Sequence, residues 1–383
     1  MLRRAGLGLF VGALLFAPAV ATAGPALVFE PVNGTVFYSE DPDAQWFPAS
    51  LTKLMTAYVT FQALKRGEVQ PDTKLTCTKN AVDQAPSKLW LPVGGQITVD
   101  IALKVLIVKS ANDVAVMLAE GVGGSEEAFV VRMNEAAQKL GMTRTHYANP
   151  NGLPDDRQVT SARDLAKLTR AIIVEFPEYA DIFALPSVTV GKKVLRTHNR
   201  LLASFPGADG MKTGFICESG FNFIGSATRQ GRTLSAIVLG ADSITDRAAE
   251  TAALLAQGFA NAEAAGPTLA SMPVDGNGVG EATNMRQALC SKEARQKKKQ
   301  KLADAGGEDD TDQAPLVMGS PYLHKLDHPR NVVMVSLGGA TGPGGLPEPV
   351  EYADVPIPTP RPDYTPPAKP AKPVAKAQSA TVQ

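Results

Sequence analysis

The chain has 383 residues, of which 44% are hydrophobic and 20% charged, enough for one large domain or two modest ones with a substantial core. Its 38 basic and 38 acidic residues give a formal net charge of zero. A neutral chain has no overall field that steers nucleic acid, so the composition indicates no DNA or RNA partner.

The first residues have the pattern of a secretory signal peptide. Two arginines precede the apolar run 7–20, and Ala-Thr-Ala at 21–23 forms a small-residue cleavage site. The apolar run is short for a membrane span, so we expect residues 1–23 to be a signal peptide that is removed on export. An uncleaved membrane anchor is the alternative.

A hairpin and then a helix are the first elements that the mature chain predicts. Two alternating apolar runs flank Asn33-Gly34 in LVFEPVNGTVFYS, which is typical of a β-hairpin. In FPASLTKLMTAYV, Pro48 fixes a turn, so Ser50 falls at or just before the first turn of a helix. The simplest interpretation is an N-cap, in which Ser50 satisfies a backbone N–H and Lys53 points to water.

Helical periods follow in the middle of the chain, and strands follow later. Ser161 and Asp164 resemble a capping box at the start of one helix. The turn 229–232 joins two strands, which must pair antiparallel. This order predicts an α+β fold, an antiparallel sheet flanked by helices. The expected helices are 99–108, 114–120, 126–141, the segment from 161 and about 245–261, and the expected strands are 187–190, about 212–216, 221–228 and 233–240.

The composition changes after about residue 264. A lysine-rich run at 292–301 is followed by an acidic segment and a Pro-rich end. Such segments bury too little apolar surface to fold, so we expect a domain at 24–264 and a low-complexity, largely disordered tail at 265–383. A short strand near 331–337 is an exception. The lysine run is either a solvated face or a contact for anionic envelope polymers, and no amphipathic membrane anchor is recognisable.

Three cysteines remain for the oxidising compartment outside the cytoplasm: Cys77, Cys217 and Cys290. An odd count allows one disulfide and one free thiol. We favour a bridge between Cys217 and Cys290, because Cys290 lies just outside the compact region and a bridge would tie it to the fold. A bridge that includes Cys77 remains the alternative.

Three short signatures carry the chemistry: Ser50-x-x-Lys53, Ser110-Ala-Asn112 and Lys212-Thr-Gly214. Each occurs once, in this order and at predicted helix or strand starts, so their combination is far more specific than any one of them. The chain thereby resembles the serine penicillin-recognising enzymes. More narrowly, PASLTKLMTA, SANDVAVMLAE, NPNGLPDD and GADGMKTGF resemble the low-molecular-weight D-alanyl-D-alanine carboxypeptidases, over roughly residues 26–262.

The resemblance implies a β-lactamase/transpeptidase-like fold with a helical subdomain and a serine DD-peptidase domain over 24–264. It implies a carboxypeptidase that trims peptidoglycan stem peptides ending in D-Ala-D-Ala and is inhibited by β-lactams. The signal peptide and the lack of a recognisable membrane anchor favour an exported, periplasmic enzyme that is soluble or associated with the cell wall. No cofactor or metal is expected, because the four histidines show no zinc-ligand spacing, and His146 and His198 are expected to be structural.

Physical reasoning gives Ser50 and Lys53 catalytic roles. A serine hydroxyl is a poor nucleophile until a base takes its proton, and Lys53 shares a helix face with Ser50. The pKa of Lys53 must then fall from about 10.4 toward about 7–8, and burial, the helix N-terminus and Lys212 all lower it. The resemblance supports Asn112 as a holder of Lys53 and a substrate amide, and Ser110 as the group that passes a proton to the departing amine.

The expected oxyanion donors are the backbone N–H groups of Ser50 and Phe215, and Gly214 lets the strand approach the ligand. The substrate's terminal carboxylate requires cationic and hydroxyl partners. The candidates are Lys212, Thr213 and Arg247, and Arg247 matches the family's carboxylate-binding arginine by its distance along the chain.

Other functions remain open. A DD-endopeptidase would cut cross-links with the same residues, and a non-catalytic wall-binding protein would use the tail to recruit partners. A class A β-lactamase would need a deacylating Glu between Asn112 and Lys212, but Glu175 and Glu178 lie in a helix-end context. The β-rich second domain and the membrane anchor of many relatives are not recognisable.

Overall fold

The computed structural model describes residues 24–191, 193–261, 266–274, 280–304, 320–326 and 333–335. The signal peptide that the sequence predicts lies outside these ranges. No helix among the described residues is long and apolar enough to cross a membrane.

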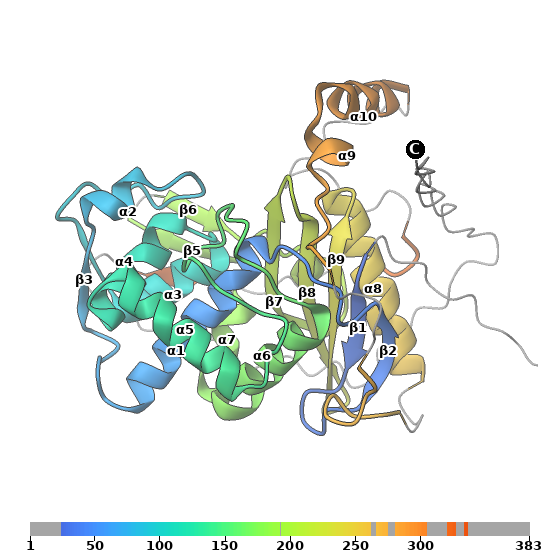
Figure 1. Ribbon diagram of the computed structural model, residues 1–383, viewed down its shortest axis with the longest axis horizontal. Coiled ribbons are helices and arrows are strands. Elements are labelled where there is room, and N and C mark those ends of the chain that lie inside the picture. The colour runs from blue at the N-terminus through green and yellow to red at the C-terminus, as the bar shows by residue number, and fades with distance from the viewer. Residues whose placement is uncertain are drawn as a thin grey trace, which may run out of the picture.

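A five-stranded sheet with the order β2-β1-β9-β8-β7 forms the centre of the molecule (Figure 1). Every neighbouring pair is antiparallel, including the two predicted hairpins, β1–β2 and β8–β9. The edge strand β7 contains the Lys-Thr-Gly motif. The strands are β1 (Ala26–Phe29), β2 (Val36–Glu40), β7 (Ala208–Ile216), β8 (Gly220–Arg229) and β9 (Arg232–Ala241).

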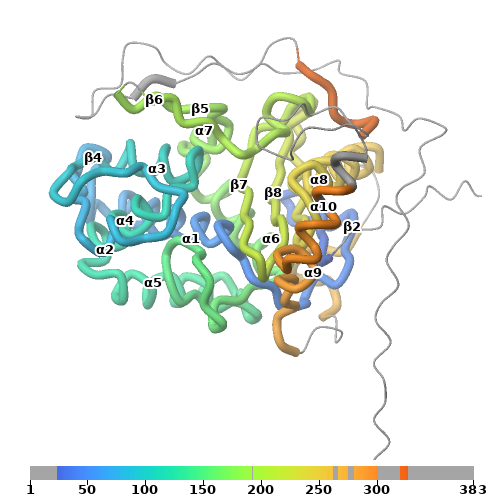
Figure 2. The backbone as a smooth tube through the Cα atoms, turned by 90° about the horizontal axis from the view of Figure 1, so that it is seen from above, coloured from blue at the N-terminus to red at the C-terminus, as the bar shows by residue number. Residues whose placement is uncertain are grey.

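Helices cover both faces of this sheet. Side chains alternate along β1, so Ala26 and Val28 join the core under α8 while Leu27 and Phe29 join the larger core on the helical side. Figure 2 shows α1, α3, α4 and α5 on one side of strands β7 and β8 and α8 on the other. The main helices are α1 (Thr52–Lys65), α3 (Val99–Val108), α4 (Asn112–Gly123), α5 (Glu126–Lys139), α6 (Ala162–Glu175) and α8 (Ile244–Ala260).

Helix α1 is buried on nearly all sides, because residues 52–61 have no exposed side chain. Most of these buried side chains are apolar, so the helix belongs in the interior. The start of α1, which includes Lys53, lies between β7 and the helical subdomain, which is formed mainly by α3, α4 and α5. Smaller elements complete this subdomain and its edge: α2 (Lys79–Asp83), α7 (Ala180–Phe183), β3 (Lys74–Thr76), β4 (Gln96–Thr98), β5 (Ser187–Val190) and β6 (Lys193–Arg196).

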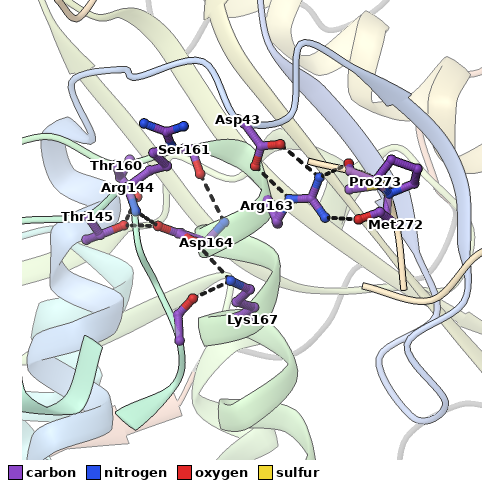
Figure 3. A network of polar contacts seen from close by, with 11 residues as sticks. Asp43, Arg144, Thr145, Thr160, Ser161, Arg163, Asp164, Lys167, Met272 and Pro273 are labelled. Carbon is purple, nitrogen blue, oxygen red and sulfur yellow. Dashed lines mark hydrogen bonds and ion pairs between the residues drawn. The ribbon is translucent and has the colours of Figure 1, made fainter. Parts of the chain in front are cut away.

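Ser161, where a capping box is predicted, is the N-cap of α6, since its Oγ accepts a hydrogen bond from the backbone N–H of Asp164 at 3.2 Å. The carboxylate of Asp164 in turn accepts from Thr145 Oγ1 at 2.9 Å (Figure 3). Burial raises the pKa of Asp164, while the nearby ammonium of Lys167 acts in the opposite direction. This network fixes the first turn of α6.

The packed structure continues past residue 264, where composition predicts the domain to end. Arg163 forms a buried ion pair with Asp43 at 2.6 Å and also donates to the carbonyl oxygens of Met272 at 2.9 Å and Pro273 at 2.6 Å (Figure 3). Together these bonds give the guanidinium hydrogen-bond partners, without which its burial would destabilise the folded state. A side chain of α6 therefore holds the segment around residue 272 against the domain.

The tail also contains helices where the composition predicts a disordered or extended chain. The segment α9 (Arg286–Cys290) ends at the bridge between Cys217 and Cys290, which confirms the favoured pairing, and α10 (Lys292–Asp304) follows it. The run KEARQKKKQK consists largely of good helix formers, which explains how a charged stretch adopts a helix. The strand β10 (Val333–Val335) pairs with β5 and lies within the predicted range 331–337.

Candidate active site

Ser50 lies in the short 3₁₀ helix η1 (Ala49–Leu51) that leads into α1. Its side chain is not an N-cap, because neither η1 nor α1 has a side-chain cap hydrogen bond. Ser50 Oγ instead accepts a hydrogen bond of 3.0 Å from Nζ of Lys53. The capping interpretation is therefore wrong, and the pair has the geometry of a nucleophile and its base.

Lys53 is fully buried and surrounded by oxygen atoms. Besides Ser50, its Nζ donates to Oδ1 of Asn112 at 2.7 Å and to the backbone carbonyl of Asn151. These three oxygen atoms surround Nζ and hold the head group in one position.

Burial lowers the pKa of Lys53 well below its ordinary value, and the positive charge of Lys212 lowers it further. The carboxylate of Asp113 acts in the opposite direction. A lowered pKa increases the fraction of neutral amine, which is the form that can take a proton from a hydroxyl.

Lys212 is the second buried cation and lies on the β7 side of the site. Its Nζ donates to Oγ of Ser110 at 2.9 Å and to the carbonyl oxygen of Thr213 at 2.8 Å. Burial lowers the pKa of Lys212 to about 7, and the charge of Arg247 contributes to the shift. Ser110, between α3 and α4, is thus connected to the cation on the sheet.

Asn112 and Asp113 fasten a loop to the start of α4. The amide nitrogen of the Asn112 side chain donates to the carbonyl of Ala85 at 2.8 Å, while its oxygen accepts from Lys53. Asp113, which is 1% exposed, accepts backbone hydrogen bonds from Leu89 and Trp90 at 2.9 Å. The two residues together join the loop 85–90 to the catalytic pair.

Two glycines allow backbone segments to approach the nucleophile. A Cβ at Gly214 would lie 3.0 Å from the backbone nitrogen of Ser50 and 3.1 Å from that of Leu51. A Cβ at Gly152 would lie 1.9 Å from the carbonyl oxygen of Ala49. The close approach that the sequence predicts for Gly214 is therefore an approach to the backbone of the turn that holds Ser50, and Phe215 follows Gly214 on the same strand.

A cleft of about 350 Å³ lies over these groups, within the size range of about 300–1,000 Å³ that is usual for ligand sites. Arg247, in the first turn of α8, lines it and donates to the carbonyl of His198 at 3.4 Å. Lys53 and Lys212 lie beneath the lining and contact it through Ser50 and Ser110. Seven of the nine predicted residues line the cleft: Ser50, Ser110, Asn112, Thr213, Gly214, Phe215 and Arg247.

Sequence reasoning missed several parts of the site. The carbonyl of Asn151 and the backbone of Gly152 belong to the NPNG segment, whose resemblance to the family predicts no role for either residue. His198, expected to be structural, lines the cleft. Ile216 and Phe221 form an apolar wall, in which Phe221 stacks on Phe215 with ring centroids 4.2 Å apart.

No described residue that lines the cleft is Asp or Glu. Glu175, one of the two acids considered for a β-lactamase, is the last residue of α6 and accepts a hydrogen bond from Tyr58 instead. Among the described residues, no group of three or more His, Cys, Asp or Glu side chains is arranged to hold a metal ion.

Comparison with known proteins gives consistent relatives. Residues 15–243 match the D-alanyl-D-alanine carboxypeptidase family of peptidases. The chain is 35% identical over 251 residues to D-alanyl-D-alanine carboxypeptidase DacA of Haemophilus influenzae, covering 64% of each chain. It is 36% identical over 240 residues to DacC of Escherichia coli, covering 61% of this chain and 60% of that one. The chain therefore matches less than two thirds of the length of these relatives.

Solved structures agree with this assignment. Penicillin-binding protein 5 of Haemophilus influenzae superposes with a TM-score of 0.61 at 33% identity, covering 64% of this chain and 72% of that one. Penicillin-binding protein D2 of Listeria monocytogenes, in its cefotaxime-bound form, gives a TM-score of 0.58 at 34% identity and is covered over its full length. The predicted antiparallel sheet with flanking helices is confirmed, and the chain belongs to the D-alanyl-D-alanine carboxypeptidase family.

Proposed function

We propose that this protein is a serine DD-carboxypeptidase, which removes the terminal D-alanine from peptidoglycan pentapeptide stems through an acyl-Ser50 intermediate. The observation that carries the proposal is the 3.0 Å hydrogen bond between a fully buried Lys53 and the hydroxyl of Ser50. Family membership supplies the substrate class.

The first half-reaction forms the acyl-enzyme. Neutral Lys53 takes the proton of Ser50, and Oγ attacks the carbonyl carbon of the penultimate D-alanine. Negative charge develops on the carbonyl oxygen, where the backbone N–H groups of Ser50 and Phe215 stabilise it. The close packing of Gly214 on the nucleophile turn supports this pairing of donors.

The C–N bond then breaks and an ester to Ser50 remains. The departing amine needs one proton, and Ser110 passes it from the buried lysines, because its Oγ accepts from Lys212 at 2.9 Å. Water completes the cycle by attacking the ester: one of its protons returns to Ser50, the other is released to solvent, and the shortened peptide leaves with a new carboxylate.

The terminal carboxylate of the substrate binds at the β7 end of the cleft. Lys212, the Thr213 hydroxyl and Arg247 gather there, and a cationic site favours an anionic group. A penicillin carries a carboxylate beside its reactive amide in the same relation, so β-lactams acylate Ser50 and inhibit the enzyme. The cefotaxime- and ampicillin-bound forms of the Listeria neighbour support this part of the proposal.

We place the protein outside the cytoplasm, in the periplasm. The bridge between Cys217 and Cys290 supports this location, because disulfides persist in oxidising compartments. The predicted signal peptide and the wall substrate of the family are consistent with it.

The test is release of D-alanine from a soluble pentapeptide that ends in D-Ala-D-Ala, using the chain from Gly24. Ser50→Ala removes the nucleophile and should abolish release. Ser39→Ala, on the exposed face of β2, is the matched control and should retain full activity. Cleavage of a cross-linked muropeptide dimer without release from the pentapeptide would instead assign a DD-endopeptidase, and folded wild-type protein inactive on both would refute a peptidase.

A further inference from the structure

The segment 284–290 of the tail clamps the turn that joins β7 to β8. The Cys217–Cys290 disulfide ties the two covalently. The backbone N–H of Met285 donates to the carbonyl of Glu218 at 2.9 Å, and Nε of Arg286 donates to the Glu218 carboxylate at 2.9 Å. A disulfide, a backbone hydrogen bond and an ion pair thus hold the segment 284–290 to the turn 217–219. We call these three contacts the clamp.

This turn belongs to the wall of the catalytic cleft. Phe215 and Ile216 line the cleft immediately before Cys217, and Phe221 lines it immediately after the turn. Met285 also fills the space beside Gly220, where a Cβ would lie 2.6 Å from its sulfur. Figure 1 shows α9 and α10 standing at this end of the sheet. The clamp therefore fixes the start of α10 relative to the cleft.

Helix α10 presents a row of cations to solvent. Lys292, Arg295, Lys297 and Lys299 are all exposed. Lys292, Arg295 and Lys299 are spaced i, i+3 and i+7, so they share one face of the helix. Within the described part of the chain, none of the four has an ion-pair partner.

We propose that the exposed cations of α10 form a docking surface for polymeric peptidoglycan, which the clamp holds beside the cleft. The proposal rests on the proposed function for its choice of partner. Stem peptides carry free carboxylates, and many stems along one glycan strand make the polymer a polyanion. A polymer that occupies the cleft with one stem extends beyond it, so neighbouring stems can reach α10 while a short soluble peptide cannot.

The experiment separates binding from catalysis. Co-sedimentation with purified sacculi is measured in the Ser50→Ala background, so that no turnover occurs. The test variant replaces the four α10 cations with Gln, which preserves helix propensity. The matched control replaces the same number of exposed cations on the helical subdomain with Gln, at Lys65, Lys74, Lys79 and Lys139. A third variant exchanges Lys and Arg within α10 and keeps its charge.

We expect the α10 Gln variant to bind sacculi at least about fivefold more weakly than the control variant, and the charge-preserving variant to bind normally. Binding by the control variant should weaken as ionic strength rises from about 0.01 to about 0.15 M, because the Debye length falls from about 30 to about 8 Å. In the active enzyme, the Gln substitutions in α10 should leave turnover of the soluble pentapeptide unchanged.

Three results would overturn the proposal: equal binding by the two Gln variants, no binding by the unsubstituted protein, or stronger α10-dependent binding to anionic phospholipid vesicles than to sacculi. Failure of the proposed function is seen separately, as absence of D-alanine release from the soluble pentapeptide by the Ser50 enzyme.

Discussion

The two buried lysines of the cleft differ in what surrounds them. Lys53 lies on a helix packed on nearly all sides, reaches three oxygen atoms and has a carboxylate, Asp113, that raises its pKa against the effect of burial. Lys212 lies on the edge strand β7, reaches two oxygen atoms and has the cation Arg247 as its main charged neighbour.

This difference in surroundings indicates that the two lysines have different roles. The contacts of Lys53 fix its position against Ser50, as a proton acceptor requires. Lys212 shares its end of the cleft with a second cation, and an anionic substrate group would relieve the repulsion between them. The geometry thus predicts that losing Lys53 affects chemistry, whereas changing the charge of Lys212 affects substrate capture.

The largest effect is expected from Lys53→Met, which keeps an unbranched side chain, one heavy atom shorter, and removes the base. The value of kcat/KM for D-alanine release should fall by about 10²–10⁴-fold, because general-base catalysis contributes about that much. Lys65→Met, at the exposed end of the same helix, is the control and should retain activity. Near-normal turnover by Lys53→Met would assign the base elsewhere.

The second-largest effect is expected from Gly214→Ala. The new methyl group would lie 3.0 Å from the backbone nitrogen of Ser50, so β7 or the nucleophile turn must shift. We expect at least about a tenfold loss of kcat, since displacements of about 1 Å can cost about 10²-fold. Gly280→Ala, at a position with open space around it, is the control. Full activity in Gly214→Ala would show that the close approach is not needed.

The pH dependence tests the charge of Lys212. Its pKa of about 7 means that the cationic fraction falls from about one half at pH 7 to about one tenth at pH 8. Over this interval kcat/KM should decline by up to about fivefold relative to Lys212→Arg, because the guanidinium stays protonated. Parallel pH profiles for the two enzymes would contradict a role for this cation in substrate capture.

The smallest effect is expected from Cys217→Ser with Cys290→Ser. The ion pair and backbone bond of the clamp remain, so turnover of the soluble pentapeptide should fall by no more than about threefold, equivalent to less than about 1 kcal/mol. The single variant Cys77→Ser, at a buried free thiol, controls for cysteine removal. A loss comparable to that of Gly214→Ala would mean that the bridge alone positions the cleft wall.

The sequence allowed prediction of the parts of the site that depend on local spacing. Ser50 and Lys53 meet because a helix places residues three apart on one face, and Ser161 caps its helix for similarly local reasons. The carbonyl of Asn151 could not be predicted as a partner of Lys53, because every residue has a carbonyl and only the fold selects one. The position of His198 in the cleft lining could not be predicted either, because it depends on distant elements that meet at the cleft.

The tail shows a second limit, that of predicting structure from composition. A charged, lysine-rich run is consistent with disorder, yet the same residues are good helix formers. The predicted bridge to Cys290 was the signal that part of the tail belongs to the fold. The hydrogen bond from Arg163 to the carbonyl of Met272 had no such signal, because it joins residues far apart in sequence.

The most direct test of the central claim is mass spectrometry of the protein after brief exposure to a β-lactam and rapid quenching. The account predicts one covalent adduct, on the peptide that contains Ser50, formed quickly by the wild type, slowly by Lys53→Met and not by Ser50→Ala. An adduct on another residue, or equally fast labelling of Lys53→Met, would contradict the claim that buried Lys53 activates Ser50.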